Sequence, residues 1–318
     1  MKPPYQITNE ILALIASISE KIGEINATHL QKAPATLRKS NRIKTIQSSL
    51  EIEGNTLSVE QITDIINNKR VLAPQKDILE VKNAIALYDD LNQFNPRALN
   101  SFLQAHKILM HGLIDAPGKI RTKAVGIVKG SKITHVAPPG EMVKALLNDL
   151  FAYLKNGKDL VLIKSCVFHY EIEFIHPFID GNGRMGRFWQ TLILKEQYPL
   201  FEYLPIETVV KRRQIDYYKA LSISDKSGHS TPFIEFMLAV IEESLEELLT
   251  SQNTSVTSVD RISLFKQKIK DAPFTRKDYL RENKDISSAT ASRDLKEAIE
   301  KKLLNKTGDK RVTVYNFL

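Results

Sequence analysis

The stretch Phe174-Ile-His-Pro-Phe-Ile-Asp-Gly-Asn-Gly-Arg-Met-Gly-Arg187 decides how this chain is expected to fold. The residues before it are apolar at helical spacing, and a proline disfavours the helical conformation of the preceding residue, so Pro177 predicts a helix end near His176. The Gly-Asn-Gly run permits backbone angles and close approaches that side chains would forbid. A second helix is expected to begin at about Arg184.

The side chains of this stretch fit the chemistry of phosphate esters. Free N–H groups at the start of the second helix, with Arg184 and Arg187 one turn apart, form an anion site that suits phosphates. Asp180 offers a hard oxygen ligand for Mg²⁺ between those phosphates. His176 stands beside the anion, where it can act as a general base. Together these groups indicate phosphoryl or nucleotidyl transfer.

The motif resembles the signature of a known family. Residues His176-x-Phe178-x-Asp180-Gly181-Asn182-Gly183-Arg184-x-x-Arg187 match every signature position of the Fic-domain family. Most members of that family transfer AMP from ATP to a hydroxyl group of a target protein. The resemblance covers residues 1–250 or so and implies a mainly α fold, a Fic-type helical core with a small β-hairpin flap.

The resemblance also implies a role for each motif residue. By that likeness His176 deprotonates the Ser, Thr or Tyr hydroxyl of the target, and Asp180 holds Mg²⁺ on the α- and β-phosphates of ATP. Arg184 steadies the triphosphate, Arg187 binds the γ-phosphate, and Phe178 is a core anchor. The residues that cradle the phosphates are Gly181, Asn182 and Gly183.

A second local match concerns the segment Ser49-Leu-Glu-Ile-Glu53-Gly54. By itself it is a helix end with a glutamate, but it resembles the Fic inhibitory helix, in which Ser or Thr, three residues and Glu precede Gly or Asn. A Glu53 carboxylate paired with Arg187 would take the partner of the γ-phosphate, so that ATP binds weakly or with its α-phosphate misaligned. The resemblance therefore implies self-inhibition. In some relatives the same glutamate helps to remove AMP, and the sequence leaves this open here.

Two further segments are interpreted through the resemblance. Lys123–Pro139 contains glycines and β-branched pairs, which predict a hairpin, and it resembles the flap that aligns the target as an added strand. Tyr217 and Tyr218, after Arg213, resemble the aromatic edge of the adenine pocket, although two tyrosines in a helix can equally be packing.

Helical periodicity and composition divide the chain into domains. The polar stretch Thr250–Ser258 is predicted to be a linker, and the three short helices and strand pair after it match the winged helix-turn-helix plan. The predicted domains are an N-terminal helical region at 1–98 that carries the inhibitory helix, a Fic catalytic core at 99–250 and a winged helix-turn-helix domain at 259–318. Helices of the first two are expected at about 10–24, 36–53, 58–67, 77–91, 99–111, 140–156, 160–174, 184–197, 211–222 and 231–250.

The amount and distribution of charge indicate which partners the chain could bind. The formal net charge is +8, and residues 255–318 carry 15 Lys or Arg against 9 Asp or Glu. In that segment Thr275 and Ser287 are predicted helix N-caps, and Arg293 and Lys296 lie along the helix that would read DNA. A DNA-binding regulator with a nucleotide-responsive Fic core is therefore an alternative to the enzyme. A winged helix that binds protein, or a basic surface without a ligand, also fits.

The remaining observations narrow the class of protein. With 42% hydrophobic and 26% charged residues the composition is that of a globular protein, and no stretch approaches the ~18 apolar residues of a membrane span. A single cysteine, Cys166, cannot form an internal disulfide and is expected to be a buried thiol, so a cytoplasmic location is expected. His106 and His111 lack the spacing of a metal pair, and His169 is expected in the core.

The sequence leaves the transferred group, the acceptor and the oligomeric state open. Transfer of another phosphate-containing group is the alternative within the same chemistry. The acceptor is expected to be a target protein, which could be the chain itself, and a homodimer is left open. The cofactors that the resemblance implies are ATP, as the substrate, and Mg²⁺.

Overall fold

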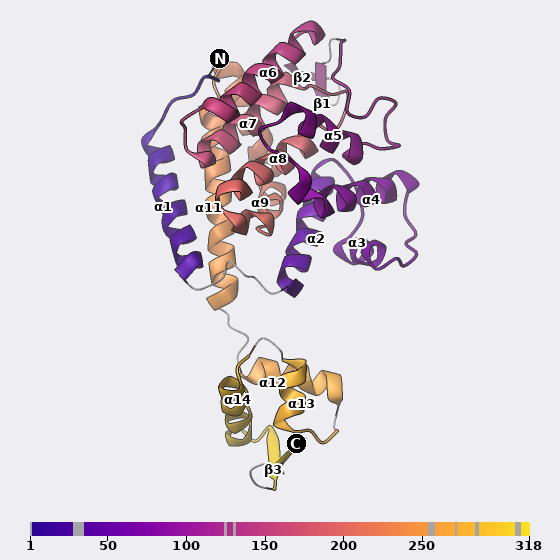
Figure 1. The fold of residues 1–318 in the computed structure, drawn as a ribbon, viewed down its shortest axis with the longest axis vertical. Helices are drawn as coiled ribbons and strands as arrows, with labels where there is room; N and C mark the ends of the chain where they lie inside the picture. The colour runs from indigo at the N-terminus through magenta and orange to yellow at the C-terminus, as the bar shows by residue number, and fades with distance from the viewer. Residues whose placement is uncertain are drawn as a thin grey trace. The chain divides into compact units, whose positions relative to one another are not determined.

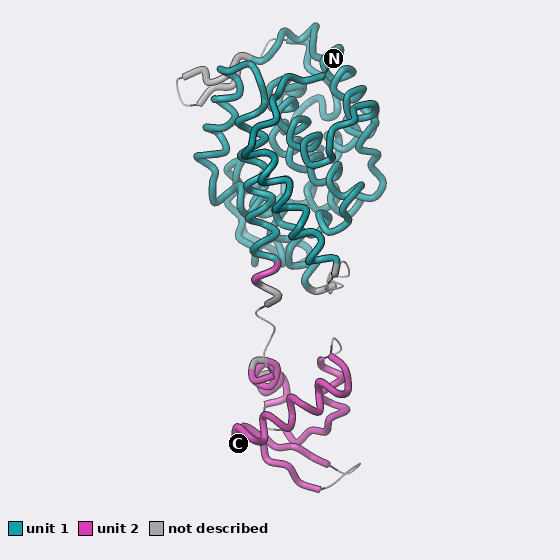
Figure 2. Tube along the Cα trace, turned by 90° about the vertical axis from the view of Figure 1, so that its left-hand side faces the viewer, with its two compact units in different colours: residues 1–248 teal, residues 249–318 magenta. Residues whose placement is uncertain are grey.

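The computed structural model describes residues 2–27, 35–123, 126–129, 132–253, 258–270, 272–283, 286–308 and 313–318. The chain divides into two compact units, Met1–Leu248 and Leu249–Leu318 (Figure 2). The first unit contains the predicted N-terminal region and nearly all of the predicted Fic core.

The first unit is helical apart from one short hairpin (Figure 1). The predicted helix over residues 211–222 is wrong as a single helix, because α9 (Ile206–Arg212) ends before Arg213 and α10 (Gln214–Ser227) begins after it. Arg213 leaves the helical conformation and places its guanidinium over the Phe236 ring, 5.1 Å from the ring centroid, so tertiary packing overrides local helical propensity. The elements are α1 (Asn9–Ala27), α2 (Ala35–Ile52), α3 (Val59–Ile66), α4 (Gln75–Asp89), η2 (Leu91–Gln93), α5 (Leu99–Leu109), β1 (Gly126–Lys129), β2 (Lys132–Val136), α6 (Gly140–Asn156), α7 (Val161–Ile175), α8 (Asn182–Gln197), η3 (Pro199–Glu202), α9 (Ile206–Arg212), α10 (Gln214–Ser227) and α11 (Thr231–Asn253).

The core of this unit forms where α7 and α8 pack against each other, in the middle of the helices in Figure 1. Both helices bury most of their residues; the sequence of α7 is apolar, whereas α8 also buries Arg184 and Arg187. Their close approach depends on Gly186, because a Cβ there would lie 2.6 Å from Cδ2 of His169. The rings of Phe168 and Trp189 both lie nearly perpendicular to the ring of Phe102, at centroid distances of 5.9 and 5.0 Å.

The hairpin predicted within residues 123–139 is present as β1 and β2. The strands pair antiparallel from Gly126 opposite Val136 to Lys129 opposite Lys132, with a register shift between Ile127 and Val128. The side chains of both strands lie outside what the structure describes. The role of the hairpin as a flap therefore stays a prediction.

The second unit contains three helices and a hairpin, in the predicted order. Its elements are α12 (Ser258–Ile269), α13 (Arg276–Glu282), α14 (Ser288–Glu300), β3 (Leu304–Thr307) and β4 (Val314–Phe317). The predicted N-caps are confirmed, since Thr275 accepts from the Asp278 amide and Ser287 from the Thr290 amide. The winged helix-turn-helix assignment of this unit stays a prediction.

The second unit has a small core of its own. Phe265 contacts Phe274 and Tyr279 at centroid distances of 4.8 and 5.1 Å. The buried Asp294 carboxylate accepts from Arg261 at 2.7 Å and from the Tyr279 hydroxyl at 3.1 Å. A separate core and a paired buried charge are what an independent compact unit needs. In the part of the chain that the structure describes, no helix combines the length and apolarity that crossing a bilayer requires.

Candidate active site

The predicted catalytic loop lies between α7 and α8. α7 ends at Ile175, and His176 adopts a left-handed conformation with φ 49° and ψ 61°. This conformation is uncommon outside glycine and persists where surrounding structure holds it. The sequence predicted that the helix ends here because of Pro177, and the helix end is confirmed. The left-handed turn itself depends on contacts from elsewhere in the chain.

Arg121, which no sequence pattern singles out, provides those contacts. Its Nε donates to the carbonyl of His176 at 2.6 Å, and its Nη2 donates to the carbonyl of Ile175 at 3.0 Å. The same guanidinium donates to the carbonyls of Lys123 and Pro138, at 2.7 Å each, on either side of the hairpin. The side chain is buried, which lowers the pKa of Arg121. Arg121 thus connects both ends of the hairpin to the catalytic loop.

His106 supports the loop from α5. Its Nδ1 accepts from the Gly118 amide at 2.8 Å, so the proton of the neutral ring is on Nε2, which donates to the carbonyl of Asp180 at 3.0 Å. The ring stacks on Phe178, with 3.5 Å between the ring centroids. Burial lowers the pKa of His106 to about 4, so the ring is neutral near pH 7. The spacing of His106 and His111 argued only against a metal pair, and no sequence pattern indicated this contact of His106.

The start of α8 is built from the Gly-Asn-Gly run, and the helix begins at Asn182, two residues earlier than predicted. Gly181 has a φ of 85°, and its amide donates to Oδ1 of Asp180 at 2.6 Å. The Asn182 side chain bonds both the amide of Phe178, at 2.9 Å, and its carbonyl, at 3.0 Å. The side chain of Asn182 therefore closes the loop. The first backbone N–H groups of α8 have no acceptor within the helix, which leaves them for an anion.

Arg184 lies beneath this helix start and is buried between two carboxylates. Its Nη2 is 3.1 Å from Oδ1 of Asp180, and its Nη1 is 3.4 Å from Oε1 of Glu80 on α4. The Nε atom is buried and has no hydrogen-bond partner among the described residues. A buried donor without a partner is costly, so this arginine suits an anionic ligand that would supply the missing acceptor.

Arg187 is bound by the segment that was predicted to be inhibitory. Its Nε donates to the Ser49 hydroxyl at 3.1 Å, and its Nη2 donates to the Ser49 carbonyl at 3.0 Å and to Oε1 of Glu53 at 2.6 Å. The Arg187 side chain is 2% exposed and that of Glu53 is 31% exposed. Burial alone would lower the pKa of Arg187, but the nearby Glu53 carboxylate reverses the effect, and the pKa is raised.

The Glu53 carboxylate also lies over the first turn of α8. A Cβ on Gly183 would stand 2.7 Å from its Oε1 atom, so the absence of a side chain at Gly183 makes room for it. The N-terminus of a helix carries partial positive charge and favours an anion at this place. Glu53 follows the last residue of α2, where Gly54 turns the chain with a φ of 92°. One carboxylate therefore contacts both the arginine and the helix start that were predicted to bind phosphates.

The two tyrosines of α10 are placed differently from each other. Tyr217 is 1% exposed, and its hydroxyl donates to Oε1 of Glu173 at 2.8 Å and contacts Nε2 of His169 at 3.0 Å. In this conformation its ring has no open face for an adenine base. Tyr218 is half-buried. His169 continues the buried chain to Gln190 at 2.7 Å, and burial lowers the pKa of His169 to about 3.

The residues present fit a magnesium ion held jointly with phosphates. Within the described residues no cluster of three or more His, Cys, Asp or Glu side chains could hold a metal alone. Mg²⁺ bound to nucleotides usually takes one or two carboxylates and completes its shell with phosphate oxygens and water. The Asp180 carboxylate is 50% exposed at the edge of the loop and can serve as that ligand. Cys166 is buried, as predicted, and burial raises the pKa of its thiol to about 12.

The sequence resembles curated proteins over most of its length. Residues 96–194 match the model of the Fic/DOC family. The protein adenylyltransferase fic-1 of Caenorhabditis briggsae is 28% identical over 248 residues, which cover 73% of this chain and 46% of that protein. The protein adenylyltransferase Fic of Nematostella vectensis is 27% identical over 259 residues, 77% of this chain and 57% of that protein. This chain therefore spans about half the length of the curated relatives it matches.

Solved structures resemble the fold as well. The fic-1 structure from Caenorhabditis elegans is 22% identical, with a TM-score of 0.64 and coverage of 77% of this chain and 73% of that one, which shows a shared fold. The crystal structure of a Fic family protein from Desulfovibrio desulfuricans G20 is 40% identical, with a TM-score of 0.81. It covers 100% of this chain, and this chain covers 98% of it. Because the likeness extends over both whole chains, the present chain belongs to the Fic/DOC family.

Proposed function

We propose that the chain is a protein adenylyltransferase that transfers AMP from ATP to a Ser, Thr or Tyr hydroxyl of a target protein. The observation that carries the proposal is the single loop that brings together His176, the Asp180 carboxylate and the open N-terminus of α8. The relatives named as protein adenylyltransferases support it, since they match the segment that contains this loop.

Each group of the loop would take one part of the transfer. His176 would accept the proton of the attacking hydroxyl. The amides of the first turn of α8, with Arg184, would bind the triphosphate, and Arg187 would hold the γ-phosphate so that the α-phosphate faces the hydroxyl. Asp180 would hold Mg²⁺, which supplies positive charge for the α- and β-phosphates. For the adenine base we propose a contact with Tyr218 rather than with the buried Tyr217.

We propose further that Glu53 inhibits this enzyme. Its carboxylate is 2.6 Å from Nη2 of Arg187 and lies over Gly183, so a γ-phosphate and this carboxylate would need the same donors. Two anions cannot share that space, because their repulsion would not be screened in a largely buried site. ATP would therefore bind only after the Glu53 side chain leaves, or would bind with its α-phosphate out of line.

The proposal is tested with ATP labelled at the α-phosphate, Mg²⁺ and the full chain. Glu53→Gly should transfer label to protein, and Glu53→Gly combined with His176→Ala should not. Glu51→Gly is the matched control, because Glu51 is two residues earlier and pairs with Lys211 at 2.9 Å instead of with Arg187. It should remain as inactive as the wild type. Equal label on wild type and Glu53→Gly would remove the inhibitory role, and label that survives the loss of His176 would remove the catalytic base.

The same assay separates the alternative chemistry. Transfer from ATP labelled at the γ-phosphate, without transfer of the α-label, would identify a phosphotransferase. The acceptor could be a second copy of the chain, so the label on the enzyme itself is measured as well.

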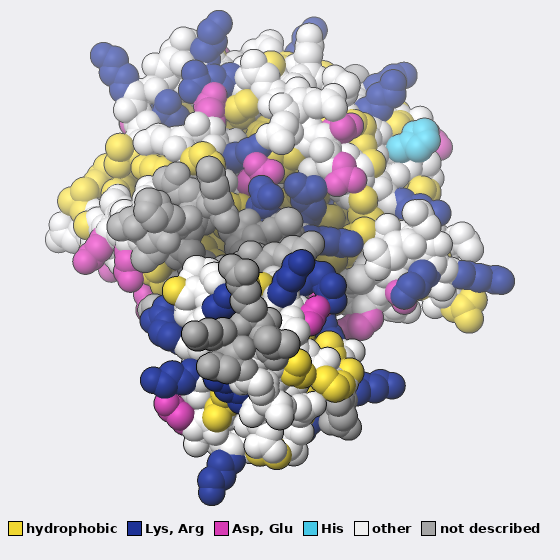
Figure 3. Space-filling view, turned by 60° about the horizontal axis from the view of Figure 1, so that its bottom comes forward, with side chains coloured by type: hydrophobic (Ala, Val, Ile, Leu, Met, Phe, Trp, Pro, Cys, Tyr) yellow, Lys and Arg dark blue, Asp and Glu magenta, His cyan; other side chains and the backbone are white. Residues whose placement is uncertain are grey.

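A second candidate function concerns the second unit. Its sequence carries 15 Lys or Arg against 9 Asp or Glu. Figure 3, which draws the whole chain, shows Lys and Arg side chains more prominently than Asp and Glu on the face in view. We propose duplex DNA as the partner that this charge would bind, through Arg293 and Lys296 on α14. Binding by the full chain should fall steeply between about 50 and 200 mM salt and should weaken when both residues become Gln. Lys301→Gln is the control, because Lys301 follows the end of α14 and pairs with Glu297 at 2.7 Å, more closely than Lys296 pairs with Glu300, at 3.8 Å. Binding that does not depend on salt, or that is absent, would contradict DNA as the partner.

A further inference from the structure

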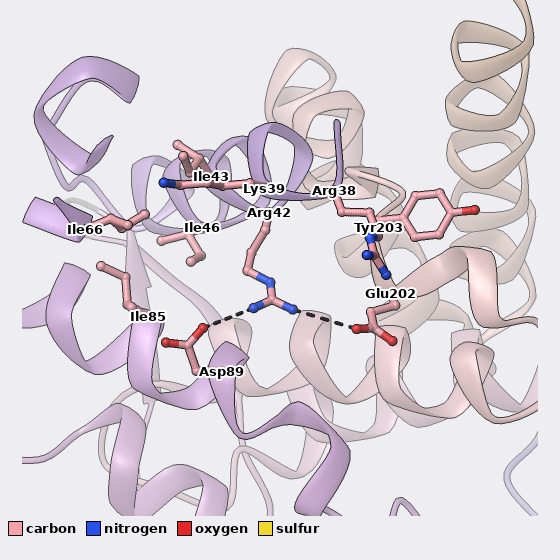
Figure 4. A pocket seen from close by; sticks show the side chains of 10 residues that line it. All are labelled: Arg38, Lys39, Arg42, Ile43, Ile46, Ile66, Ile85, Asp89, Glu202 and Tyr203. Carbon is pink, nitrogen blue, oxygen red and sulfur yellow. Dashed lines mark hydrogen bonds and ion pairs between the residues drawn. The ribbon is translucent and has the colours of Figure 1, made fainter. Parts of the chain in front are cut away.

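A cavity of about 350 Å³ lies beside the inhibitory helix, at the end opposite to Glu53 (Figure 4). Helix α2 forms one wall, and α3, α4 and the segment around η3 form the others. Its volume is within the range of about 300–1,000 Å³ that is typical of small-molecule sites. None of the residues proposed above for catalysis or inhibition lines it.

The walls of this cavity carry two kinds of side chain. Four isoleucines come from three helices: Ile43, Ile46, Ile66 and Ile85. Three basic side chains come from consecutive turns of α2: Arg38, Lys39 and Arg42. Figure 4 shows Lys39 beside the isoleucines, where its ammonium donates to Asn67 at 3.4 Å, whereas Arg38 and Arg42 reach toward Glu202. Apolar side chains together with guanidinium groups accept a molecule with an apolar body and an acidic end.

Arg42 is the central cation of this cavity. Figure 4 shows its side chain reaching from α2 between Asp89 and Glu202, at 3.0 and 3.7 Å from their carboxylate oxygens. These two carboxylates offset part of the basic charge. Arg38 and Lys39 are exposed, and neither forms an ion pair with a carboxylate of the described residues. Three cations against two carboxylates leave the cavity positive.

We propose that this cavity binds a small amphipathic anion, a carboxylate with an aliphatic or aromatic body. The acid group would bind Arg42 together with Arg38 or Lys39, as charge-assisted hydrogen bonds to guanidinium and ammonium groups favour. The body would cover the isoleucines and bury their apolar surface. The shape excludes neither an aliphatic nor an aromatic body, so both belong to the test.

The same helix connects this cavity to the inhibitory contact. Residues 42, 46 and 49 follow one another on α2 at spacings of four and three, so they share one face of the helix, and residue 53 comes directly after its end. Toward the N-terminus of α2, Arg42 and Ile46 line the cavity, and at its C-terminal end Ser49 and Glu53 hold Arg187. Glu202, which pairs with Arg42, also pairs with Lys195 on α8, the helix that carries Arg187, at 3.1 Å.

Through this geometry the bound anion would weaken the inhibition by Glu53, an inference that rests on the proposed function. An acid that binds Arg42 competes with Asp89 and Glu202, the two contacts through which this side chain holds α2 to α4 and η3. A ligand shifts an equilibrium toward the state that it binds better. The anion would therefore favour a shifted α2, in which Glu53 has left Arg187, and transfer by the wild type would rise.

Binding is tested first, by calorimetric titration of the full chain with decanoate and with 1-naphthoate. Saturable binding of either acid is expected, with decanol at least about tenfold weaker, because decanol lacks the charge. Arg42→Met should weaken the acid by at least about tenfold, since it keeps apolar volume and removes the guanidinium. The control is Lys164→Met, in a different cavity of about 300 Å³, and should bind as the wild type does. A second variant, Arg38→Gln with Lys39→Gln, changes only exposed residues. It replaces Arg42→Met in the titration if Arg42→Met does not fold.

The outcomes separate this proposal from the proposed function. Absence of saturable binding, or equal binding by Arg42→Met and Lys164→Met, would overturn the site. Binding that leaves wild-type AMP transfer unchanged would overturn the coupling, because the acid should raise transfer in the wild type and not in Glu53→Gly. Absence of transfer in every variant, Glu53→Gly included, would instead count against the adenylyltransferase, and the titration would still decide whether the cavity binds the acid.

Discussion

Replacing Arg121 by methionine should show how the catalytic loop is held. The change removes four hydrogen bonds to main-chain carbonyls, at 2.6, 2.7, 2.7 and 3.0 Å, and keeps most of the apolar volume. A hydrogen bond from a charged donor contributes about 1.5 kcal/mol or more, so the gross loss is about 6 kcal/mol. Removing a buried guanidinium relieves its desolvation, and water can reach part of the loop. We therefore expect the free energy of unfolding to fall by about 3–5 kcal/mol.

The fluorescence of Trp189 provides the assay during denaturation by guanidinium chloride. It is the only tryptophan, and it is fully buried in the first unit, so it reports on that unit. Arg97→Met is the control: the Arg97 guanidinium is largely exposed and pairs with Glu196 at 2.9 Å, and a pair of that kind contributes at most about 1 kcal/mol. If Arg121→Met loses no more stability than Arg97→Met, the loop is not held by this arginine, and the reasoning from its carbonyl contacts is refuted.

Two further predictions concern the packing around the loop. Burial lowers the pKa of His106 from 6.5 to about 4 in the folded chain. As the pH drops, the unfolded chain therefore binds a proton at this histidine before the folded chain does. The free energy of unfolding should fall by up to about 3 kcal/mol between pH 6.5 and pH 4. His106→Gln should lose this part of the pH dependence, and an unchanged slope in denaturation curves would contradict the neutral histidine. Gly186→Ala should cost about 1–3 kcal/mol, because its Cβ would stand 2.6 Å from His169, and a melting temperature equal to that of the wild type would show that α7 and α8 can separate freely.

Sequence-based prediction succeeded where a contact has a local signature. Pro177 signals a helix end, and Thr275 and Ser287 cap the helices that follow them, as the sequence predicted. The pairing of Glu53 with Arg187 joins residues 134 positions apart, but the segment around Glu53 has a recognisable pattern, and so the ion pair was expected.

Contacts to main-chain carbonyls could not be predicted in this way. Arg121 is 55 residues from His176, and His106 is 74 residues from Asp180, and in each pair the acceptor is a carbonyl that every residue possesses. The side chain of the accepting residue can therefore be of any type, and the sequence at that position does not indicate the contact. The side chain of Asn182 is a related case, because it bonds the backbone of Phe178 and closes the loop, while the part of Asn182 in the phosphate cradle stays a prediction.

A small displacement of α2 would break the ion pair between Glu53 and Arg187 before it breaks the contacts of Ser49. Ser49 lies within the helix and holds two nitrogens of Arg187, whereas Glu53 follows the last helical residue and is 31% exposed. Water can replace the arginine as the partner of an exposed carboxylate, whereas the arginine is 2% exposed and would be left with its contacts to Ser49 and the attraction of the Glu173 carboxylate. Losing Glu53 alone therefore leaves a buried, positively charged donor beside the open N-terminus of α8. That arrangement would suit a phosphate, so under the proposed function the energy of the Glu53–Arg187 contact would become affinity for the γ-phosphate once the carboxylate has moved away.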